Sequence, residues 1–200
     1  MIRLYKKSLS RTFIDRFTIV FLLLVIAVSL DFPNVYASES IDRRLQISLS
    51  IFPKIVAVDN GIRDKLNKKN QVLLAFLSQS DKTKPRELAK VLKSKIKNIA
   101  GMPYKLVSIN VNGILAKASF SPTAIFLTER LSPKSFNKVM DFAMRKQILV
   151  FSPFTGDVER GASVGIMITS RVKPYFNIRT LKASSISINP LLMKMSKRYE

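Results

Sequence analysis

Short apolar runs alternate with amphipathic segments along most of the chain. A short apolar run bounded by turn residues is typical of a buried strand, and apolar positions three and four apart are typical of a helix that covers a core. Strands are predicted at residues 72–77, 104–111, 124–128, 148–151, 163–169 and 173–178. Helices are predicted at residues 41–58 and 85–99, after Ser132 and after Asn189.

The predicted helix over residues 41–58 has apolar side chains on two faces, so we expect it to be buried. Pro53 lies within this segment. Because a proline ring removes a backbone donor and clashes with the preceding turn, we expect the helix to break or kink just after Phe52. Residues 59–61 then predict a turn, and the helix over 85–99 is expected to end at the glycine and proline that follow it.

The second half of the chain predicts a strand, a helix and a strand in close succession. Ser132 suits the N-cap of this helix and Pro133 suits its first position. Since the helix leads directly into residues 148–151, the three elements form the βαβ unit of a parallel sheet. Residues 163–169 and 173–178 have a short connection, so the sheet is expected to end in an antiparallel hairpin.

The last predicted helix begins with Asn189 as its cap and carries one apolar stripe, formed by Leu191, Leu192 and Met195. Such a stripe must be covered by the sheet or by another subunit, and we expect the sheet to cover it. No internal repeat or long linker divides the chain. The predicted fold class is therefore α/β, as a single three-layer domain with a mixed, mostly parallel sheet flanked by helices.

The N-terminus has the pattern of a cleavable signal peptide. A basic stretch is followed by an apolar run over residues 18–30 and then by small residues at Val35 and Ala37. The run is shorter than the roughly 20 residues that a helix needs to span a bilayer. We predict a signal peptide over residues 1–37 and a periplasmic domain over 38–200 that begins near Ser38. An uncleaved N-terminal anchor is the alternative.

Composition restricts the chemistry of the domain. The chain has no cysteine and no histidine, which removes disulfides, the usual zinc ligands and the usual neutral-pH general base. We therefore expect no enzyme activity, no metal site and no cofactor. The net charge of +21 suits anionic partners, but the lysines are spread along the chain, so we expect a solvated, cation-rich surface rather than one specific basic site. Since export argues against nucleic acid, we expect no nucleic-acid partner, and peripheral contact with anionic lipid remains open.

The best candidate site is the loop over residues 152–161, because it follows a strand end, where open α/β sheets place ligands. It gathers hydroxyl groups, two carboxylates and an arginine. A polar loop with a purely structural role is the alternative, and Phe154 is more often a core or rim aromatic than a recognition platform. The candidate ligand or partner residues are Thr128, Ser152, Phe154, Thr155, Arg160, Gly161 and Asn177.

Four mainly apolar blocks flank and follow this loop, at residues 148–152, 161–168, 175–178 and 188–195. In order and spacing they resemble the YfiR-like family of periplasmic proteins. Upstream, residues 49–56 look like that family's first helix and residues 124–128 like its central strand. The resemblance thus covers about residues 41–198, and its motifs are mainly hydrophobic.

The resemblance implies a small non-catalytic regulator that binds the periplasmic part of an inner-membrane signalling protein, such as a diguanylate cyclase or a sensor kinase, and commonly self-associates. By position, Gly161 matches the first glycine of a usual pair, and Asn177 matches the asparagine that closes the last strand. Ala162 stands where the second glycine is usual, and Pro53 also departs from the pattern. The family's usual cysteines are absent, so disulfide-based redox control cannot apply.

Two functions follow from this sequence. The main hypothesis is the periplasmic regulator, with a homodimer as one possible form. The alternative is a periplasmic solute-binding protein that holds a small anion above the strand ends, with Thr128, Ser152, Thr155 and Arg160 as donors. The two are compatible, since a regulator can sense a ligand. For Asn177, a hydrogen bond to the neighbouring loop is expected rather than contact with a ligand.

Overall fold

The computed structural model describes residues 33–80, 83–117 and 119–200, and side chains from Asp42 onward. The chain forms two compact units, Met1–Asp42 and Arg43–Glu200. Most of the predicted signal peptide lies outside the described residues, and the position before Ser38 falls within helix α2, Pro33–Ala57. None of the helices in the described ranges is both long and apolar enough to cross a membrane.

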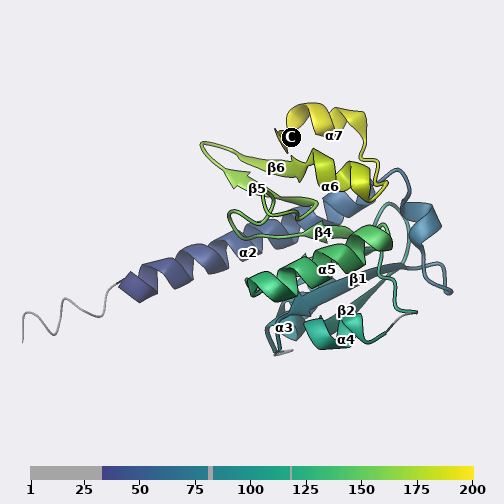
Figure 1. Cartoon of the computed structure of the whole chain (residues 1–200), viewed down its shortest axis with the longest axis horizontal. Coiled ribbons are helices and arrows are strands. Elements are labelled where there is room, and N and C mark those ends of the chain that lie inside the picture. Colours follow the sequence, from purple (N-terminus) through teal and green to yellow (C-terminus); the bar gives the residue numbers. More distant parts are fainter. Residues whose placement is uncertain (1–32, 81–82, 118) are drawn as a thin grey trace, which may run out of the picture. The chain divides into compact units, whose positions relative to one another are not determined.

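The second unit is a three-layer α/β domain built on one mixed, mostly parallel sheet, which confirms the predicted fold class (Figure 1). The strand order is β2-β1-β3-β4-β5-β6-β7. The strands are β1 (Val72–Ser78), β2 (Tyr104–Asn110), β3 (Ala124–Leu127), β4 (Leu149–Phe151), β5 (Val164–Ile168), β6 (Val172–Asn177) and β7 (Lys197–Tyr199). After α2, the helical segments are η1 (Ile62–Lys65), α3 (Thr83–Lys95), α4 (Val111–Leu115), α5 (Pro133–Arg145), α6 (Ile178–Ala183) and α7 (Pro190–Met195).

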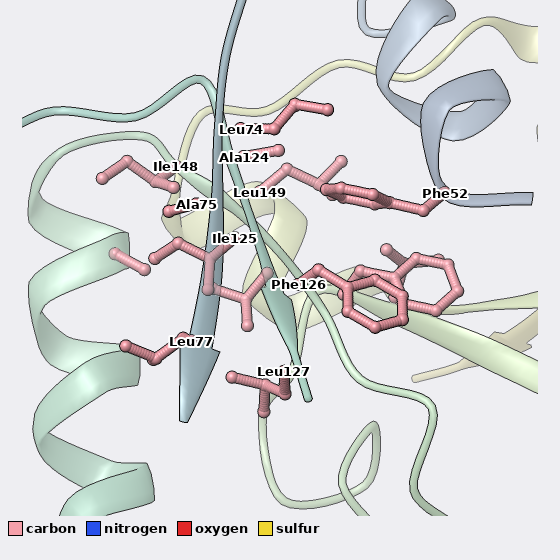
Figure 2. Close-up of a cluster of buried hydrophobic side chains, with 14 of the residues drawn as sticks. Phe52, Leu74, Ala75, Leu77, Ala124, Ile125, Phe126, Leu127, Ile148 and Leu149 are labelled. Carbon is pink, nitrogen blue, oxygen red and sulfur yellow. The ribbon is translucent and has the colours of Figure 1, made fainter. Parts of the chain in front are cut away.

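The core lies on both faces of the parallel strands. Every residue of β1, β3 and β4 is buried, as expected for strands covered by helices on both sides. Phe52 of α2 packs against the rings of Phe126 and Phe151, with centroids 5.2 and 5.6 Å apart. Figure 2 shows Ile125 on the other side of the sheet, toward α5. Helix α5 has the predicted Ser132 N-cap, whose side chain accepts from Ser135 N.

The predicted break after Phe52 is wrong, because α2 continues through Pro53 to Ala57. The residues on both sides of the proline explain this continuity. Phe52, Ile55 and Val56 are all buried in the core, so packing holds the last turns in helical form although one backbone donor is missing.

The predicted helix over residues 85–99 begins earlier and ends earlier, as α3 over Thr83–Lys95. The Tyr104 hydroxyl donates to the carbonyl of Ile96, and Ile99 and Met102 exchange two backbone hydrogen bonds. Gly101, at φ +78°, therefore serves a tight turn rather than the helix end itself. Helix α4 was not predicted, since Asn110 lies in a strand-like pattern but acts as the N-cap of α4.

The C-terminal part differs most from the prediction. The hairpin of β5 and β6 is antiparallel as expected, but β7 pairs in parallel with β6, so the sheet does not end in that hairpin. Helix α6 follows directly after β6. Helix α7 has the predicted Asn189 cap, but Leu191 and Met195 are 70% and 72% exposed, so the sheet does not cover the predicted stripe. Within that stripe, only Leu192 packs against the core.

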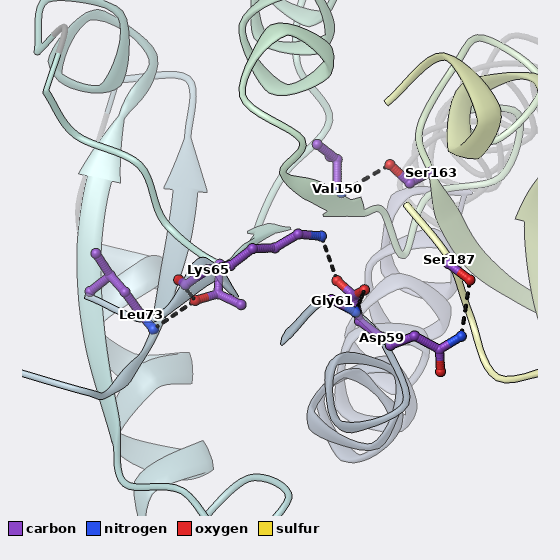
Figure 3. Close-up of polar contacts among 9 residues, drawn as sticks. Asp59, Gly61, Lys65, Leu73, Val150, Ser163 and Ser187 are labelled. Atoms are coloured by element: carbon purple, nitrogen blue, oxygen red, sulfur yellow. Dashed lines mark hydrogen bonds and ion pairs between the residues drawn. The ribbon is translucent and has the colours of Figure 1, made fainter. Parts of the chain in front are cut away.

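Buried hydrogen bonds and one ion pair connect the segments that precede β1 and β3 (Figure 3). The Asp59 carboxylate accepts from Lys65 at 2.6 Å and from Gly61 N at 3.0 Å, which fixes the predicted turn over residues 59–61. The Thr123 hydroxyl donates to Lys65 O and accepts from Leu73 N, so it joins this turn to β1. These groups satisfy one another, as buried polar groups must.

Candidate functional site

The loop over residues 152–161 folds around one buried carboxylate, that of Asp157, which is 0% exposed. The Ser152 hydroxyl donates to its Oδ2 at 2.7 Å and accepts from Phe154 N. Arg160 donates to Oδ1 at 3.1 Å, and Nη1 of Arg130 lies 3.6 Å from the same oxygen. Asp157 is thus paired with two cations and one hydroxyl, an arrangement that compensates a buried charge.

The two arginines are held by aromatic rings as well as by Asp157. The Arg160 guanidinium lies 4.4 Å from the centroid of the Phe136 ring, and that of Arg130 lies 5.7 Å from the Phe154 centroid. Arg130 also donates to the carbonyl of Thr155 at 2.9 Å. These contacts hold the loop in one conformation. They also engage the Arg160 guanidinium, which was predicted to donate to a bound anion.

Three further candidate residues have polar contacts within the fold. The Thr128 hydroxyl donates to Leu77 O and is completely buried. The Asn177 side chain donates to Val158 O at 2.7 Å and accepts from Thr180 N, so it has the loop contact that we expected and also caps α6. Gly161 has φ +120°, a conformation that favours glycine, and its carbonyl accepts from Thr180.

A pocket of about 190 Å³ lies beside this loop. Its walls come from the loop, from β5 and β6, and from Arg44 at the start of the second unit. The lining residues are Arg44, Phe154, Thr155, Gly156, Val158, Glu159, Ile166, Met167, Ile168 and Tyr175. Of the predicted site residues, Phe154 and Thr155 line the pocket, whereas Thr128, Ser152, Arg160, Gly161 and Asn177 do not.

Arg44 joins α2 to both walls of the pocket. Its Nε donates to the carbonyl of Pro153 and its Nη2 to the carbonyl of Ile166. Nη1 has no hydrogen-bond partner among the described residues, so it retains donors for a ligand. Burial lowers the pKa of Arg44 from its ordinary value, and the nearby Glu159 carboxylate partly opposes this effect.

Tyr175 is the second polar group in the pocket wall. Burial raises the pKa of its hydroxyl, and the charge of Glu159 and a hydrogen bond to that carboxylate raise it further. The remaining wall is mainly apolar, with Phe154, Val158 and Ile166 all buried. The Tyr175 hydroxyl donates its proton to Glu159, so Arg44 is the donor of this wall. A partly buried guanidinium beside apolar side chains can bind a carboxylate attached to a small apolar group.

Sequence reasoning missed Arg44, Asp157 and Tyr175 as the groups that organise this region. Arg44 follows another arginine in a predicted helix, and nothing local indicates which of the two reaches a loop more than 100 residues away. Asp157 was noted only as one of two loop carboxylates. Its position five residues after a strand-end serine was a usable signal, because that spacing allows a hydroxyl to reach a carboxylate within one tight loop.

The described residues contain no group of three or more acidic side chains that could hold a metal ion. Asp157 is enclosed by its own partners, and Glu159 hydrogen-bonds Tyr175. Among the described residues, the pocket lining therefore offers the Arg44 guanidinium, the Glu159 carboxylate and apolar side chains to a ligand.

No family model matches the chain, and no curated protein matches it. Among solved structures it is similar to the crystal structure of an ABC domain in complex with L-Trp from Streptococcus pneumonia, with 13% identity, 72% of this chain covered and a TM-score of 0.46. It is also similar to that of a conserved domain protein from Vibrio cholerae, with 14% identity, 68% coverage and a TM-score of 0.48. The chain spans 60% and 57% of those two chains. The resemblance to the YfiR-like family stays a prediction.

Proposed function

We propose that the protein is a non-catalytic binding protein that takes a small carboxylate-bearing molecule into the pocket between the 152–161 loop and the β5–β6 hairpin. This is the solute-binding alternative of the sequence analysis, placed at a site with different donors. One observation carries the proposal: Arg44, which is fixed by the carbonyls of Pro153 and Ile166 and keeps Nη1 without a partner among the described residues, lies in the wall of a mainly apolar pocket. Burial also shifts the pKa of Arg44 and that of Tyr175 in the same wall. Shifted groups that converge in a mainly apolar pocket are typical of a binding site.

The chemistry of the pocket favours a carboxylate over an inorganic anion. Arg44 can donate through Nη1, whereas the proton of the Tyr175 hydroxyl is held by Glu159. Phe154, Val158 and Ile166 offer apolar surface that a bare anion would not use. Glu159 acts against any anion here, because its negative charge lies close to Arg44. The bound molecule is therefore expected to gain affinity from apolar contact as well as from charge.

Isothermal titration with phenylacetate and phenylacetamide tests this proposal, because the two probes share a shape and differ in charge. Loss of charge-assisted hydrogen bonds to Arg44 should weaken binding of the amide by about tenfold or more. The Glu159→Gln variant should bind phenylacetate more tightly than the wild type, since a competing charge is removed. Equal binding of acid and amide, or no binding of either, would refute the proposal.

A variant that fills the pocket serves as the structural control. Ile168 lines the pocket but is 42% exposed, so Ile168→Trp should occupy the cavity without disturbing the core. Phenylacetate binding should be lost in this variant while the melting temperature stays close to that of the wild type. Unchanged binding would place the ligand elsewhere on the protein.

The regulator of the sequence analysis is a second candidate, favoured by the exposed apolar side chains of α7. Leu191 and Met195 are mostly exposed, and Lys194, Lys197 and Arg198 lie beside them in sequence. A partner surface with apolar residues and an acidic rim would complement this arrangement, and the resemblance points to the periplasmic part of an inner-membrane signalling protein.

Co-purification from solubilised inner membrane tests the regulator. One identified membrane protein should be retained by the wild type and lost with Leu191→Ser/Met195→Ser. A double variant on α5, Lys134→Gln/Lys138→Gln, should retain it as the wild type does. Equal retention by all three proteins would count against this second candidate.

Both candidate functions require export to the periplasm. Its basis is the basic, apolar and small-residue pattern of the first 37 residues. N-terminal sequencing of the protein from a periplasmic extract should begin at or next to Ser38. Recovery of only the full-length chain in the membrane fraction would contradict cleavage and favour the N-terminal anchor.

A further inference from the structure

Helix α3 packs against β2, the edge strand at the start of the sheet order (Figure 1). A second hollow lies between the end of this helix and β2. It has a volume of about 440 Å³. The lining residues are Lys93, Lys97, Pro103, Tyr104, Lys105 and Leu106. We call this feature the lysine groove. It shares no residue with the Arg44–Tyr175 pocket, so it is a separate candidate site.

The three lysines of the groove come from three different segments. Lys93 lies in the last turn of α3, where a cation interacts favourably with the helix dipole. Lys97 lies in the loop after α3, and Lys105 lies in β2. The helix dipole gives Lys93 a role in helix stability. It gives no such role to Lys97 and Lys105, which line the same hollow.

Within the part of the chain that the structure describes, no acidic side chain is paired with these lysines. The groove lining contains no acidic residue, and none of the three lysines forms an ion pair with a described residue. Like charges gathered at one place repel one another, so the folded state gains stability when an anion enters. Their ammonium groups are exposed and remain able to bind it.

Hydrogen bonds hold the connection between α3 and β2, which carries Lys97, in place before any ligand binds. The Tyr104 hydroxyl donates to Ile96 O at 2.9 Å, which ties the loop after α3 to the start of β2. Ile99 and Met102 close the intervening turn with hydrogen bonds of 3.0 and 2.9 Å. Lys97 and Lys105 therefore flank a short, doubly tied connection, and binding need not order a flexible loop.

We propose that the lysine groove binds phosphate groups. An ammonium group binds phosphate as a point charge, and several of them suit a dense, multiply charged oxyanion better than a single carboxylate. Two sources offer this chemistry: a free polyphosphate and the headgroups of an anionic lipid surface. The three lysines of the groove belong to the +21 net charge of the chain, and none of them lines the carboxylate pocket.

The test compares two double variants of the whole chain with equal charge loss. Lys97→Gln/Lys105→Gln removes two cations from the groove, and Lys134→Gln/Lys138→Gln removes two exposed cations from α5. One arm measures the melting temperature with pyrophosphate. The other measures sedimentation with vesicles of phosphatidylglycerol, corrected for binding to phosphatidylcholine vesicles, which isolates the effect of the anionic headgroup.

Each lysine near an anionic surface contributes about fivefold to binding, so the groove variant, which loses two, should bind about twenty-fivefold more weakly than the wild type. The α5 variant should change little. A selective loss with pyrophosphate assigns the site to free phosphates, and a selective loss only with vesicles assigns it to lipid. Equal losses in the two variants would show diffuse charge and overturn the proposal. So would the absence of binding in both arms.

Discussion

The parallel half of the sheet and the C-terminal part of the domain are built in different ways. In the parallel half, β1, β3 and β4 are buried along their whole length between helices. In the C-terminal part, from β5 to β7, the strands carry exposed residues and α7 has no buried residue at all. The four large apolar side chains that are exposed among the described residues, Ile168, Val172, Leu191 and Met195, all lie in this part.

This difference separates stability from binding. The parallel half places its apolar side chains in one core with a cluster of phenylalanine rings, and the lysine groove lies outside that core, at the edge strand β2. The C-terminal part contributes β5 and β6 to the Arg44–Tyr175 pocket and leaves apolar residues uncovered. We therefore expect substitutions in the buried core of the first region to unfold the domain, and substitutions in the Arg44–Tyr175 pocket mainly to change binding.

The largest expected effect comes from the aromatic cluster. Phe126 is fully buried and contacts the rings of Phe52, Phe76 and Phe151. Phe126→Ala should lower the free energy of unfolding by about 3–5 kcal/mol, because it opens a cavity and removes ring contacts. Urea unfolding measures this loss, and a loss below about 1 kcal/mol would contradict the central role of the cluster.

A smaller loss is expected where the two regions meet. Gly165 of β5 lies so close to the 152–161 loop that an added Cβ would be 2.7 Å from Ser152 O and 2.8 Å from Val158 Cγ2. Gly165→Ala should cost about 1–3 kcal/mol, since backbone must move. Gly61→Ala is the matched control, because its Cβ would have only ordinary contacts. Similar melting temperatures for the two variants would disprove the close approach.

Leu192 should give a still smaller effect. It is half-buried and packs against the core, while its neighbour Leu191 is exposed. Leu192→Ala should lower stability by about 1 kcal/mol, less than a fully buried leucine would. Thermal unfolding at two protein concentrations a hundredfold apart should show the same shift. A wild-type melting temperature that rises with concentration, with the rise lost in the variant, would instead indicate a dimer seam.

The smallest effect concerns the pH dependence of stability. The pKa of Tyr175 is raised in the folded state, so its proton is held more tightly there than in the unfolded chain. The stability that it contributes is fully present below a pH of about 10, the ordinary tyrosine value, and is lost as the pH rises through the folded pKa. Tyr175→Phe should lose less stability than the wild type in this alkaline range. Parallel pH profiles from urea unfolding would contradict the shift.

The parallel half was predictable from the sequence because each buried strand is a short apolar run and because Ser132 and Pro133 mark the start of α5. The C-terminal part was less predictable. Strand β7 is short and carries Lys197 and Arg198, so no apolar pattern indicates it. Asn110 and Asn177 cap α4 and α6, and each is also the last residue of a strand. The alternation of apolar and polar residues in the strand runs up to the cap, so the sequence does not indicate where the helix begins.

Two of the predicted site residues, Ser152 and Arg160, are engaged in contacts within the fold for a physical reason. Hydroxyl and charged residues in a loop are as suitable for internal bonds as for a ligand, and Ser152 and Arg160 both bind Asp157. The group that reaches the pocket, Arg44, comes from a distant helix, and only the folded chain brings it to Ile166 and Pro153. Composition and spacing contain no information on such a long-range contact.

Amide chemical-shift mapping by NMR during a phenylacetate titration tests the central claim most directly. If the C-terminal pocket binds the carboxylate, the largest shifts should fall on Phe154 to Glu159, on Ile166 to Ile168 and on Tyr175, with saturation at a defined ligand concentration. The amide chemical shifts of β1 and α3 should not change. Shifts centred on Lys93, Lys97 and Lys105, or spread evenly over the surface without saturation, would contradict the account.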